Sequence, residues 1–314
     1  MRLGFAVKVL GRPGLKSNDA RRSQSGPHLS VSLRYLDAIL DYLVDAQISM
    51  YRISSEIAPY ITHPDLPEFH NQLDECREEL ARIGEKARAQ GVRLSMHPSQ
   101  YIVLNSPTES VYEASVRDFV YHAEFLDAMG LGPEAVIVTH GGGVYGDKPA
   151  AIDRFVERYK RLPERVRARL VLENDEKSYT APDIVGIHER TGVPLVLDNL
   201  HHAVNNPAGL SHREAAFACV PTWPRGVVPK IHYSSTRTEA RLVVRRNRKT
   251  GLTTTIETPP LASQHSDCIV AGEFFAFVQE TAPLEYDVML EAKQKDVALL
   301  RLRDELRALG LETR

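Results

Sequence analysis

Side chains that bind metal ions recur at the ends of apolar segments in this sequence. The clearest case is the apolar run 170–173, which ends on Glu173. Five other strand-like segments end in the same way, and the six terminal residues are His97, His140, Glu173, Asp198, His232 and Glu291. A single histidine in such a place is most often a packed or solvent-facing residue. Six such residues in equivalent places predict a shared site for divalent ions, because buried carboxylates without partners are costly.

Two more histidines extend this set. His201 follows Asp198 by three residues, and His265 follows a long loop. Imidazole together with carboxylate suits Zn, Mn or Fe, and the lack of thiolates argues against a structural zinc clamp. Glu173 can bridge two ions through its two oxygens, and ion pairs about 3.5–4 Å apart stabilise both the attacking and the leaving oxygen of phosphoryl displacement. We therefore expect a catalytic pair of ions, with His201 and His265 available for a third.

Positioning these ligands requires a particular fold. Eight strand-like segments alternate with segments of helical periodicity along the chain. Strict alternation of strand and helix implies a parallel sheet, and eight repeats predict a (β/α)8 TIM barrel, an α/β fold that forms a single domain over residues 1–314. The carboxyl ends of barrel strands meet at one mouth, whereas a doubly wound sheet would have difficulty placing ligands on so many strand ends.

Composition limits the choice of partners and compartment. The 314 residues are 43% hydrophobic, which suits one barrel as well as two smaller domains. A formal net charge of -2 argues against DNA binding through bulk positive charge but leaves room for a local basic patch. The three cysteines are far apart, which fits a reducing, cytoplasmic setting without a disulfide framework. No apolar run approaches the length that spans a membrane, so we expect no membrane partner.

One segment departs from the alternation of strands and helices. We expect a β-hairpin insertion around residues 236–260, in which two β-rich runs flank a basic tip. The basic side chains of this tip are Arg245, Arg246, Arg248 and Lys249. Such a tip could lie on a phosphate backbone, where cations release counterions, and a solvated turn is an equally good interpretation.

Five motifs, taken in chain order, resemble those of the UV damage endonuclease family. They are SMHPSQY at 95–101, LENDE at 172–176, DNLHH at 198–202, KIH at 230–232 and LEAKQK at 290–295. That family is similar in fold and metal cluster to endonuclease IV, a three-metal barrel that acts at abasic sites. The resemblance implies a DNA repair endonuclease that nicks double-stranded DNA immediately 5′ to UV photoproducts. Cyclobutane pyrimidine dimers and 6-4 photoproducts are the implied lesions, with abasic sites a further substrate.

The resemblance also implies roles for individual residues. The eight metal ligands would be His97, His140, Glu173, Asp198, His201, His232, His265 and Glu291, holding two or three ions, with Mn favoured and Zn or Co as alternatives. Lys230 matches a lysine that is carboxylated, and His63 matches a further active-site histidine. Gln100 and Tyr101 match the pair that probes the damaged strand. Phe5 stands where some members have tyrosine, which would keep stacking on DNA but not the hydroxyl.

The mechanism expected from this set needs no protein nucleophile. A metal-activated hydroxide would attack the phosphorus 5′ to the lesion and leave a 3′-hydroxyl and a 5′-phosphate. The protein would act as a monomer. The main alternative is a metal-dependent sugar isomerase or epimerase on the same kind of barrel, which also gathers His, Asp and Glu at strand ends. A non-catalytic protein that binds damaged DNA is the third interpretation, and it would need an incomplete ligand set.

Overall fold

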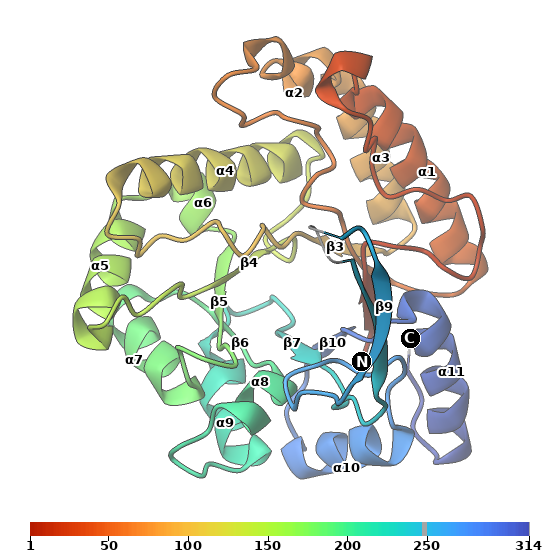
Figure 1. Ribbon diagram of the computed structural model, residues 1–314, viewed down its shortest axis with the longest axis vertical. Coiled ribbons are helices and arrows are strands. Elements are labelled where there is room, and N and C mark those ends of the chain that lie inside the picture. The colour runs from red at the N-terminus through yellow and green to blue at the C-terminus, as the bar shows by residue number, and fades with distance from the viewer. Residues whose placement is uncertain (247–249, 314) are drawn as a thin grey trace.

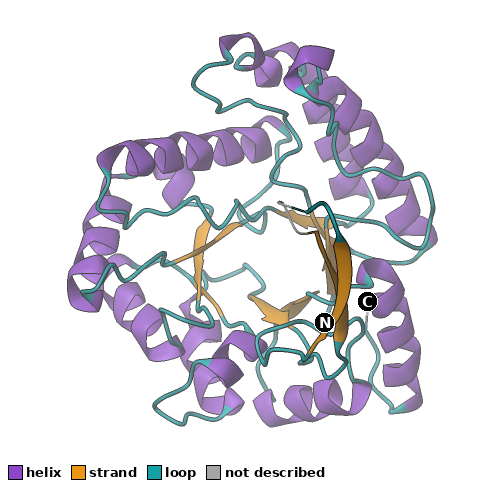
Figure 2. Ribbon diagram, in the orientation of Figure 1, coloured by secondary structure: helices purple, strands orange, loops and turns teal. Residues whose placement is uncertain are grey.

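A ring of parallel strands forms the centre of this protein. The computed structural model describes residues 1–246 and 250–313. Among these residues, eight parallel strands lie inside a ring of helices (Figure 2). The strands are β1 (Leu3–Ala6), β2 (Met50–Arg52), β3 (Arg93–Ser95), β4 (Ile137–His140), β5 (Leu170–Glu173), β6 (Leu195–Val196), β7 (Lys230–Tyr233) and β10 (Asp287–Leu290).

Hydrogen bonding between neighbouring strands closes the barrel. One sheet has the order β3-β2-β1-β10-β7 and a second has the order β4-β5-β6, and every pair in them is parallel. Two parallel bridges join the sheets, Met96 with Ile137 on one side and Asp198 with His232 on the other. The predicted (β/α)8 barrel is therefore confirmed.

Helices follow the strands and pack around the outside of the barrel (Figure 1). They are α1 (Leu29–Asp45), α2 (Gln72–Glu75), α3 (Arg77–Ala89), α4 (Glu109–Ala128), α5 (Lys148–Arg161), α6 (Glu164–Arg167), α7 (Ala181–Thr191), α8 (Asn199–Val204), α9 (His212–Cys219), α10 (Ala271–Thr281) and α11 (Lys295–Ala308). Single turns of 3₁₀ helix occur at Ser23–Ser25, Pro67–Phe69 and Val220–Thr222. No described helix combines the length and the apolar character needed to cross a lipid bilayer.

Local sequence signals set the limits of these helices. At the start of α7, the Thr180 side chain accepts a bond from the Asp183 amide while the Asp183 carboxylate accepts one from the Thr180 amide, a complete capping box. The same helix ends at Gly192, which adopts the left-handed conformation (φ 74°) that suits glycine. Ser211 and Glu214 form a second capping box at the start of α9. These contacts satisfy amides that have no partner within the helix.

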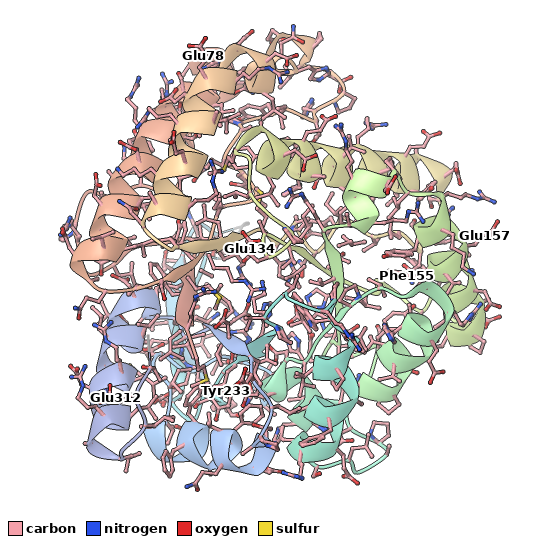
Figure 3. The ribbon with its side chains drawn as sticks, turned by 180° about the vertical axis from the view of Figure 1, so that it is seen from behind. Glu78, Glu134, Phe155, Glu157, Tyr233 and Glu312 are labelled. Carbon is pink, nitrogen blue, oxygen red and sulfur yellow. The ribbon has the colours of Figure 1, made fainter. Side chains whose placement is uncertain are left out.

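The main core lies between the barrel and the helices. On α5, Phe155 is fully buried against the barrel, whereas Glu157 points to solvent on the outer edge (Figure 3). Tyr233 of β7 packs edge-to-face against Phe274 of α10, with ring centroids 4.8 Å apart. Two smaller apolar clusters fill the barrel interior, namely Val136, Val138, Val171, Val196 and Trp223, and Ala6, Met50 and Met289. The barrel is thus packed below its mouth and is not an open channel.

Two details of the helical layer depart from a simple alternation of one strand and one helix. Residues 72–89 form two helices, α2 and α3, because Cys76 leaves helical geometry between them (φ −108°, ψ 17°). The DNLHH motif contains a short helix, α8, whose first amides are capped by Asp198. Neither difference moves a strand end.

Candidate metal centre

The barrel places all eight candidate ligands at its mouth. Side chains alternate along a strand, so inward-facing positions recur every second residue. On β7 this puts Lys230 and His232 on the inner face, and on β10 it puts Met289 and then Glu291 there. Glu173 ends β5 and lies in register with His140 of β4. The same two-residue alternation on each strand therefore directs these side chains to the centre of the barrel mouth.

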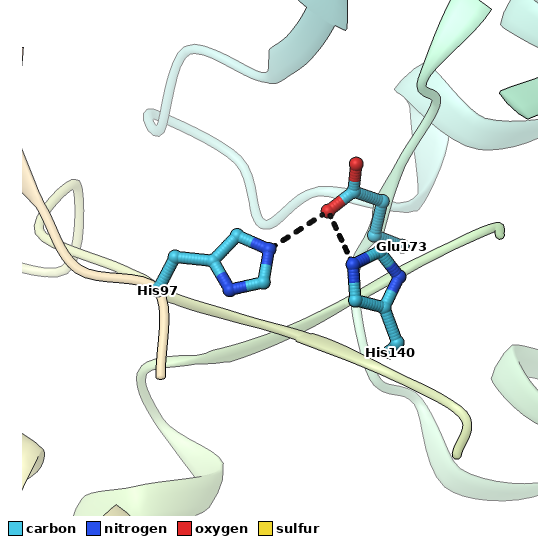
Figure 4. A group of neighbouring side chains, drawn as sticks. All are labelled: His97, His140 and Glu173. Atoms are coloured by element: carbon cyan, nitrogen blue, oxygen red, sulfur yellow. Dashed lines mark hydrogen bonds and ion pairs between the residues drawn. The ribbon is translucent and has the colours of Figure 1, made fainter. Parts of the chain in front are cut away.

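Glu173 occupies the middle of the group. One carboxylate oxygen, Oε2, lies 3.2 Å from His97 Nε2 and 3.6 Å from His140 Nε2 (Figure 4). The other oxygen, Oε1, lies 2.8 Å from His232 Nδ1 and 3.7 Å from His201 Nδ1. The side chain is 1% exposed. The histidine rings around it hold the pKa of Glu173 well below its ordinary value, although burial acts in the opposite direction.

Glu173 belongs to two sets of side chains whose ligand atoms lie within 4.8 Å of one another. The first set is His97, His140 and Glu173, and the second is Glu173, Asp198 and His232. A carboxylate common to two adjacent ligand sets is the arrangement expected of a residue that bridges two ions.

Unpartnered polar atoms in this group fit metal ligation. Asp198 Oδ2, His232 Nε2 and His140 Nδ1 are all buried, and none of them forms a hydrogen bond with the described residues. Burial lowers the pKa of His97 and of His232, which favours neutral rings that carry a free lone pair. Burial raises the pKa of Asp198 to about 6, and the charges of Glu173 and Glu291 act in the same direction. Divalent cations would accept the lone pairs of these atoms and would offset the repulsion between the buried carboxylates.

The remaining three candidates surround these two sets. Glu291 Oε1 lies 3.4 Å from His232 Nδ1, and Glu291 Oε2 lies 3.8 Å from His265 Nδ1. His201 extends from α8, and its Nδ1 is 3.8 Å from Asp198 Oδ1. The rings of His201 and His265 are 6.3 Å apart. All eight ligands that the sequence suggested are thus brought together around one mouth.

Lys230 lies directly below this group. Its side chain is 0% exposed, and Nζ donates one hydrogen bond of 3.1 Å, to Ser95 Oγ. Burial lowers the pKa of Lys230 well below its ordinary value, and the nearby charges of Arg93 and Arg52 lower it further. This environment favours the uncharged amine over the ammonium form.

Two charged residues at the centre were not predicted from the sequence. Arg52, the last residue of β2, donates a hydrogen bond to Glu291 through Nη1. Glu176 Oε2 lies 3.9 Å from His201 Nε2. Arg52 stands at the end of its strand, as the candidate ligands do. Arginine does not bind metal ions, so its residue type did not mark it as part of this site. Glu176 was part of the quoted LENDE motif without a role.

Gln100 and Tyr101 stand on the wall of a cavity that opens at the mouth. The cavity has a volume of about 700 Å³, and its lining includes His97, His140, His201, His265 and Glu291. Tyr101 is 76% exposed. A second half-exposed aromatic residue, Tyr145, lines the same cavity and was not predicted. The Tyr101 ring is available to stack on a planar group that enters the cavity, whereas the Arg154 guanidinium lies over the Tyr145 ring, 5.7 Å from its centroid.

The glycines that follow His140 have a structural reason. A Cβ atom on Gly142 would lie 2.2 Å from Asn105 Oδ1, and one on Gly141 would lie 2.6 Å from the Tyr179 ring. Asn105 also donates to the Gly143 carbonyl over 2.7 Å. The glycines therefore admit neighbouring side chains of this protein, which accounts for them without a bound phosphate.

Phe5 and His63 lie apart from the candidate ligands. Phe5 is fully buried and packs edge-to-face on Tyr51, with centroids 5.3 Å apart. Along β1, alternation turns Leu3 and Phe5 outward into the helical layer, so the proposed contact of Phe5 with DNA is wrong. His63 is exposed and lines a separate cavity beside Tyr60. Within the described part of the chain, no hydrogen bond or ion pair joins His63 to a candidate ligand.

The basic insertion is an antiparallel hairpin of β8 (Arg241–Arg246) and β9 (Thr253–Thr258). It follows β7 and stands in front of the barrel strands in Figure 1. A bridge between Thr236 and His265, one of the candidate ligands, closes its base. Arg245 and Arg246 are exposed and lie in β8, not in the tip. Arg248 and Lys249, which were also expected to contact DNA, lie outside the described residues.

Comparison with known proteins gives a consistent result. The family model described as UV-endonuclease UvdE matches residues 26–311. The UV DNA damage endonuclease of Bacillus velezensis is 34% identical over 295 residues, which cover 93% of this chain and 84% of that protein. The corresponding protein of Bacillus pumilus is 35% identical over 273 residues, covering 86% and 78%.

Solved structures agree with this result. The crystal structure of SacUVDE has a TM-score of 0.83 and 33% identity, with 99% of each chain covered. An L-ribulose 3-epimerase has a TM-score of 0.57 at 15% identity, covering 99% of this chain and 94% of that one. At that identity the epimerase shares the barrel fold alone. The match over most of the sequence and the shared structure together establish that this chain belongs to the UV-endonuclease family.

Proposed function

We propose that this protein is a DNA repair endonuclease that nicks double-stranded DNA immediately 5′ to UV photoproducts. Cyclobutane pyrimidine dimers and 6-4 photoproducts are the proposed lesions, with abasic sites as a further substrate. The products are a 3′-hydroxyl and a 5′-phosphate. Membership of the UV-endonuclease family supports the substrate. The observation that carries the chemistry is the position of Glu173 in two adjacent ligand sets.

The proposed cofactor is a cluster of two or three divalent ions, with Mn favoured by the resemblance to the UV damage endonuclease family and Zn or Co as alternatives. Imidazole and carboxylate donors are compatible with all three metals. When bound, such a cluster activates water for attack on phosphorus and neutralises the departing oxygen. The ligands that would hold it are His97, His140, Glu173, Asp198, His201, His232, His265 and Glu291.

Within the proposed mechanism, Lys230 has a supporting role. An uncharged amine can add carbon dioxide to form a carbamate, and the buried position of Lys230 favours that uncharged form. Carboxylation, with loss of a proton, would turn this neutral amine below the ligands into an anion that offers oxygen atoms. His63 remains a proposed active-site residue, although it lines a separate cavity.

Gln100 and Tyr101 are proposed to probe the damaged strand. An exposed aromatic ring can stack on bases, and an amide can hydrogen-bond to their edges. Flipping a lesion out of the duplex costs least where pairing is already damaged, so distorted DNA is favoured. Arg245 and Arg246 of the hairpin, together with Arg248 and Lys249, are proposed to contact the phosphate backbone. We propose that one chain acts as a monomer in the cytoplasm.

A plasmid assay tests this function. Supercoiled plasmid, either UV-irradiated or untreated, is incubated with metal-loaded protein, with added Mn²⁺ or with chelator. We expect relaxation only of irradiated plasmid and only with metal. A folded, metal-loaded protein that nicks neither plasmid would contradict the proposal and would favour the sugar isomerase or epimerase alternative, whose activity on ketoses would be assayed next.

A further inference from the structure

Four cationic side chains gather at the mouth, where β1, β2 and β10 end. They are Lys8, Arg52, Lys293 and Lys295. Arg52 is paired with Glu291. Lys8 and Lys293 are exposed, and Lys295 is half-buried. Within the part of the chain that the structure describes, the ammonium groups of these three lysines form no hydrogen bond or ion pair. The group therefore carries an excess of positive charge in a chain whose formal net charge is -2.

A buried aspartate fixes the two segments that carry Lys8 and Lys295. Asp296 Oδ1 accepts a 2.7 Å hydrogen bond from the Leu10 amide, and Oδ2 accepts bonds from the Gly11 amide (2.8 Å) and the Tyr42 hydroxyl (2.6 Å). A Cβ on Gly11 would lie 2.8 Å from Asp296 Oδ2. These bonds hold the segment after β1 against the first turn of α11. They also occupy the Asp296 carboxylate, which is 0% exposed and, within the described part of the chain, forms no ion pair with these lysines.

Backbone strain accompanies this arrangement. Val7 has φ 67° and Lys295 has φ 51°, values that disfavour any residue with a Cβ, above all a β-branched one. Two hydrogen bonds hold the backbone of Val7 in this conformation. Its amide donates to the Arg52 carbonyl, and its carbonyl accepts from the Tyr51 hydroxyl. Strained residues persist where their surroundings impose them, and they cluster at functional sites.

Lys295 is placed against local preference in two further ways. As the first residue of α11, it adds a cation near the positive end of the helix dipole. Burial lowers the pKa of Lys295, and the charges of Arg52, Lys293 and Lys8 lower it further. A bound anion would relieve both effects at once.

We propose that Lys8, Arg52, Lys293 and Lys295 form a phosphate-binding rim that holds the DNA backbone beside Glu291. This inference rests on the proposed action on DNA. Gln100 and Tyr101 follow β3, which is two strands from β1 in the barrel, so the rim and the probing pair face the same mouth. Contacts to phosphate set position and affinity but carry no sequence or lesion information. The rim therefore binds damaged and undamaged DNA equally and leaves lesion choice to other residues.

The test uses metal-loaded protein and a fluorescent undamaged duplex, with Kd measured by anisotropy across a range of KCl concentrations. The variants are Lys8→Gln, Lys295→Gln and the double substitution. Lys160→Gln is the matched control, because Lys160 is an exposed lysine in the last turn of α5, at the opposite end of the barrel. Lys295→Arg keeps the charge, and thermal melting checks the folding of every variant.

Each Lys→Gln change should weaken binding about three- to tenfold and reduce the slope of log K against log salt by about 0.9, with the double variant losing about 1.8. Lys160→Gln and Lys295→Arg should keep the wild-type slope. Wild-type slopes in folded Lys8→Gln and Lys295→Gln proteins would overturn the rim, as would a wild-type protein that does not bind duplex DNA.

Plasmid nicking separates this inference from the proposed function. If wild-type protein nicks irradiated plasmid while the slopes of the variants are unchanged, the rim is wrong and the function stands. If the slopes fall as expected but no nicking occurs on irradiated plasmid, the rim stands as a DNA-binding surface and the proposed activity is wrong.

Discussion

Replacing Glu173 with glutamine should separate folding from catalysis. The two side chains have nearly the same shape, so the change mainly removes a charge that is 1% exposed. That charge lies within 2.8–3.7 Å of His232, His97, His140 and His201. Both ligand sets lose their shared carboxylate. Metal-ion stabilisation of phosphoryl displacement is worth several kcal/mol, so we expect nicking to fall by at least about 10³-fold, or about 4 kcal/mol.

The effect of this substitution on stability should depend on metal. Without metal, Glu173→Gln loses charge-assisted hydrogen bonds worth about 1.5–3 kcal/mol each but no longer desolvates a carboxylate, so the net change should stay within about 2 kcal/mol. With metal, a ligand at 100 times its Kd stabilises the wild type by about 2.7 kcal/mol. The variant should lose most of that gain.

Two measurements decide the matter, namely nicking of irradiated plasmid and the rise of Tm on adding Mn²⁺. Glu157→Gln is the control, because Glu157 is an exposed glutamate on the outer face of α5 and should behave as the wild type in both. A folded Glu173→Gln protein that binds metal fully and nicks at the wild-type rate would refute the assignment of Glu173 as the bridging residue.

Three further predictions follow from contacts away from the ligands. Asp296→Asn should cost about 3 kcal/mol in urea unfolding, since the amide cannot accept all three bonds, whereas Tyr42→Phe should cost about 1 kcal/mol; equal costs would contradict the described geometry. Phe5→Tyr should destabilise by about 1–3 kcal/mol by burying a hydroxyl and leave Kd for DNA unchanged, and a tighter Kd would show that Phe5 reaches DNA. The Arg21 guanidinium lowers the pKa of Asp19 to about 2. The contact of Asp19 with Arg21 therefore stabilises the fold fully above pH 3.8, the pKa of Asp19 in the unfolded chain, and this stabilisation is lost as the pH falls toward 2. In the Asp19→Asn variant, the free energy of unfolding should therefore fall less steeply with pH across that range. A pH profile identical to that of the wild type would contradict this role of Asp19.

The barrel and its ligands were predictable because one periodicity controls both. Side chains two positions apart on a strand face the same way, so His97, Glu173 and His232 face inward when the residue two positions before each of them faces inward. The carboxyl ends of parallel barrel strands meet at one mouth, which brings these residues together. The sequence alone does not give the phase of alternation on a strand without ligands. That is why Phe5 on β1 was expected at the mouth although it faces the helices.

Contacts between distant segments were not predictable from sequence patterns. The bond from Arg52 to Glu291 and the capture of the Leu10 and Gly11 amides by Asp296 link residues more than 200 positions apart. Neither has a local signature, because each depends on how loops from different strands meet. The short helix α8 was missed for a similar reason, since Asp198 was recognised as a ligand type and not as a helix cap.

The most direct test of the central claim uses a duplex that carries a single cyclobutane pyrimidine dimer. The damaged strand is labelled at its 5′ end and incubated with protein and Mn²⁺, and the product is sized on a sequencing gel. The proposed function predicts one metal-dependent cut immediately 5′ to the dimer, a 3′-hydroxyl that a polymerase can extend, and no cut with chelator or in the undamaged duplex. Equal cutting of both duplexes, or an intact damaged strand with folded, metal-loaded protein, would contradict it.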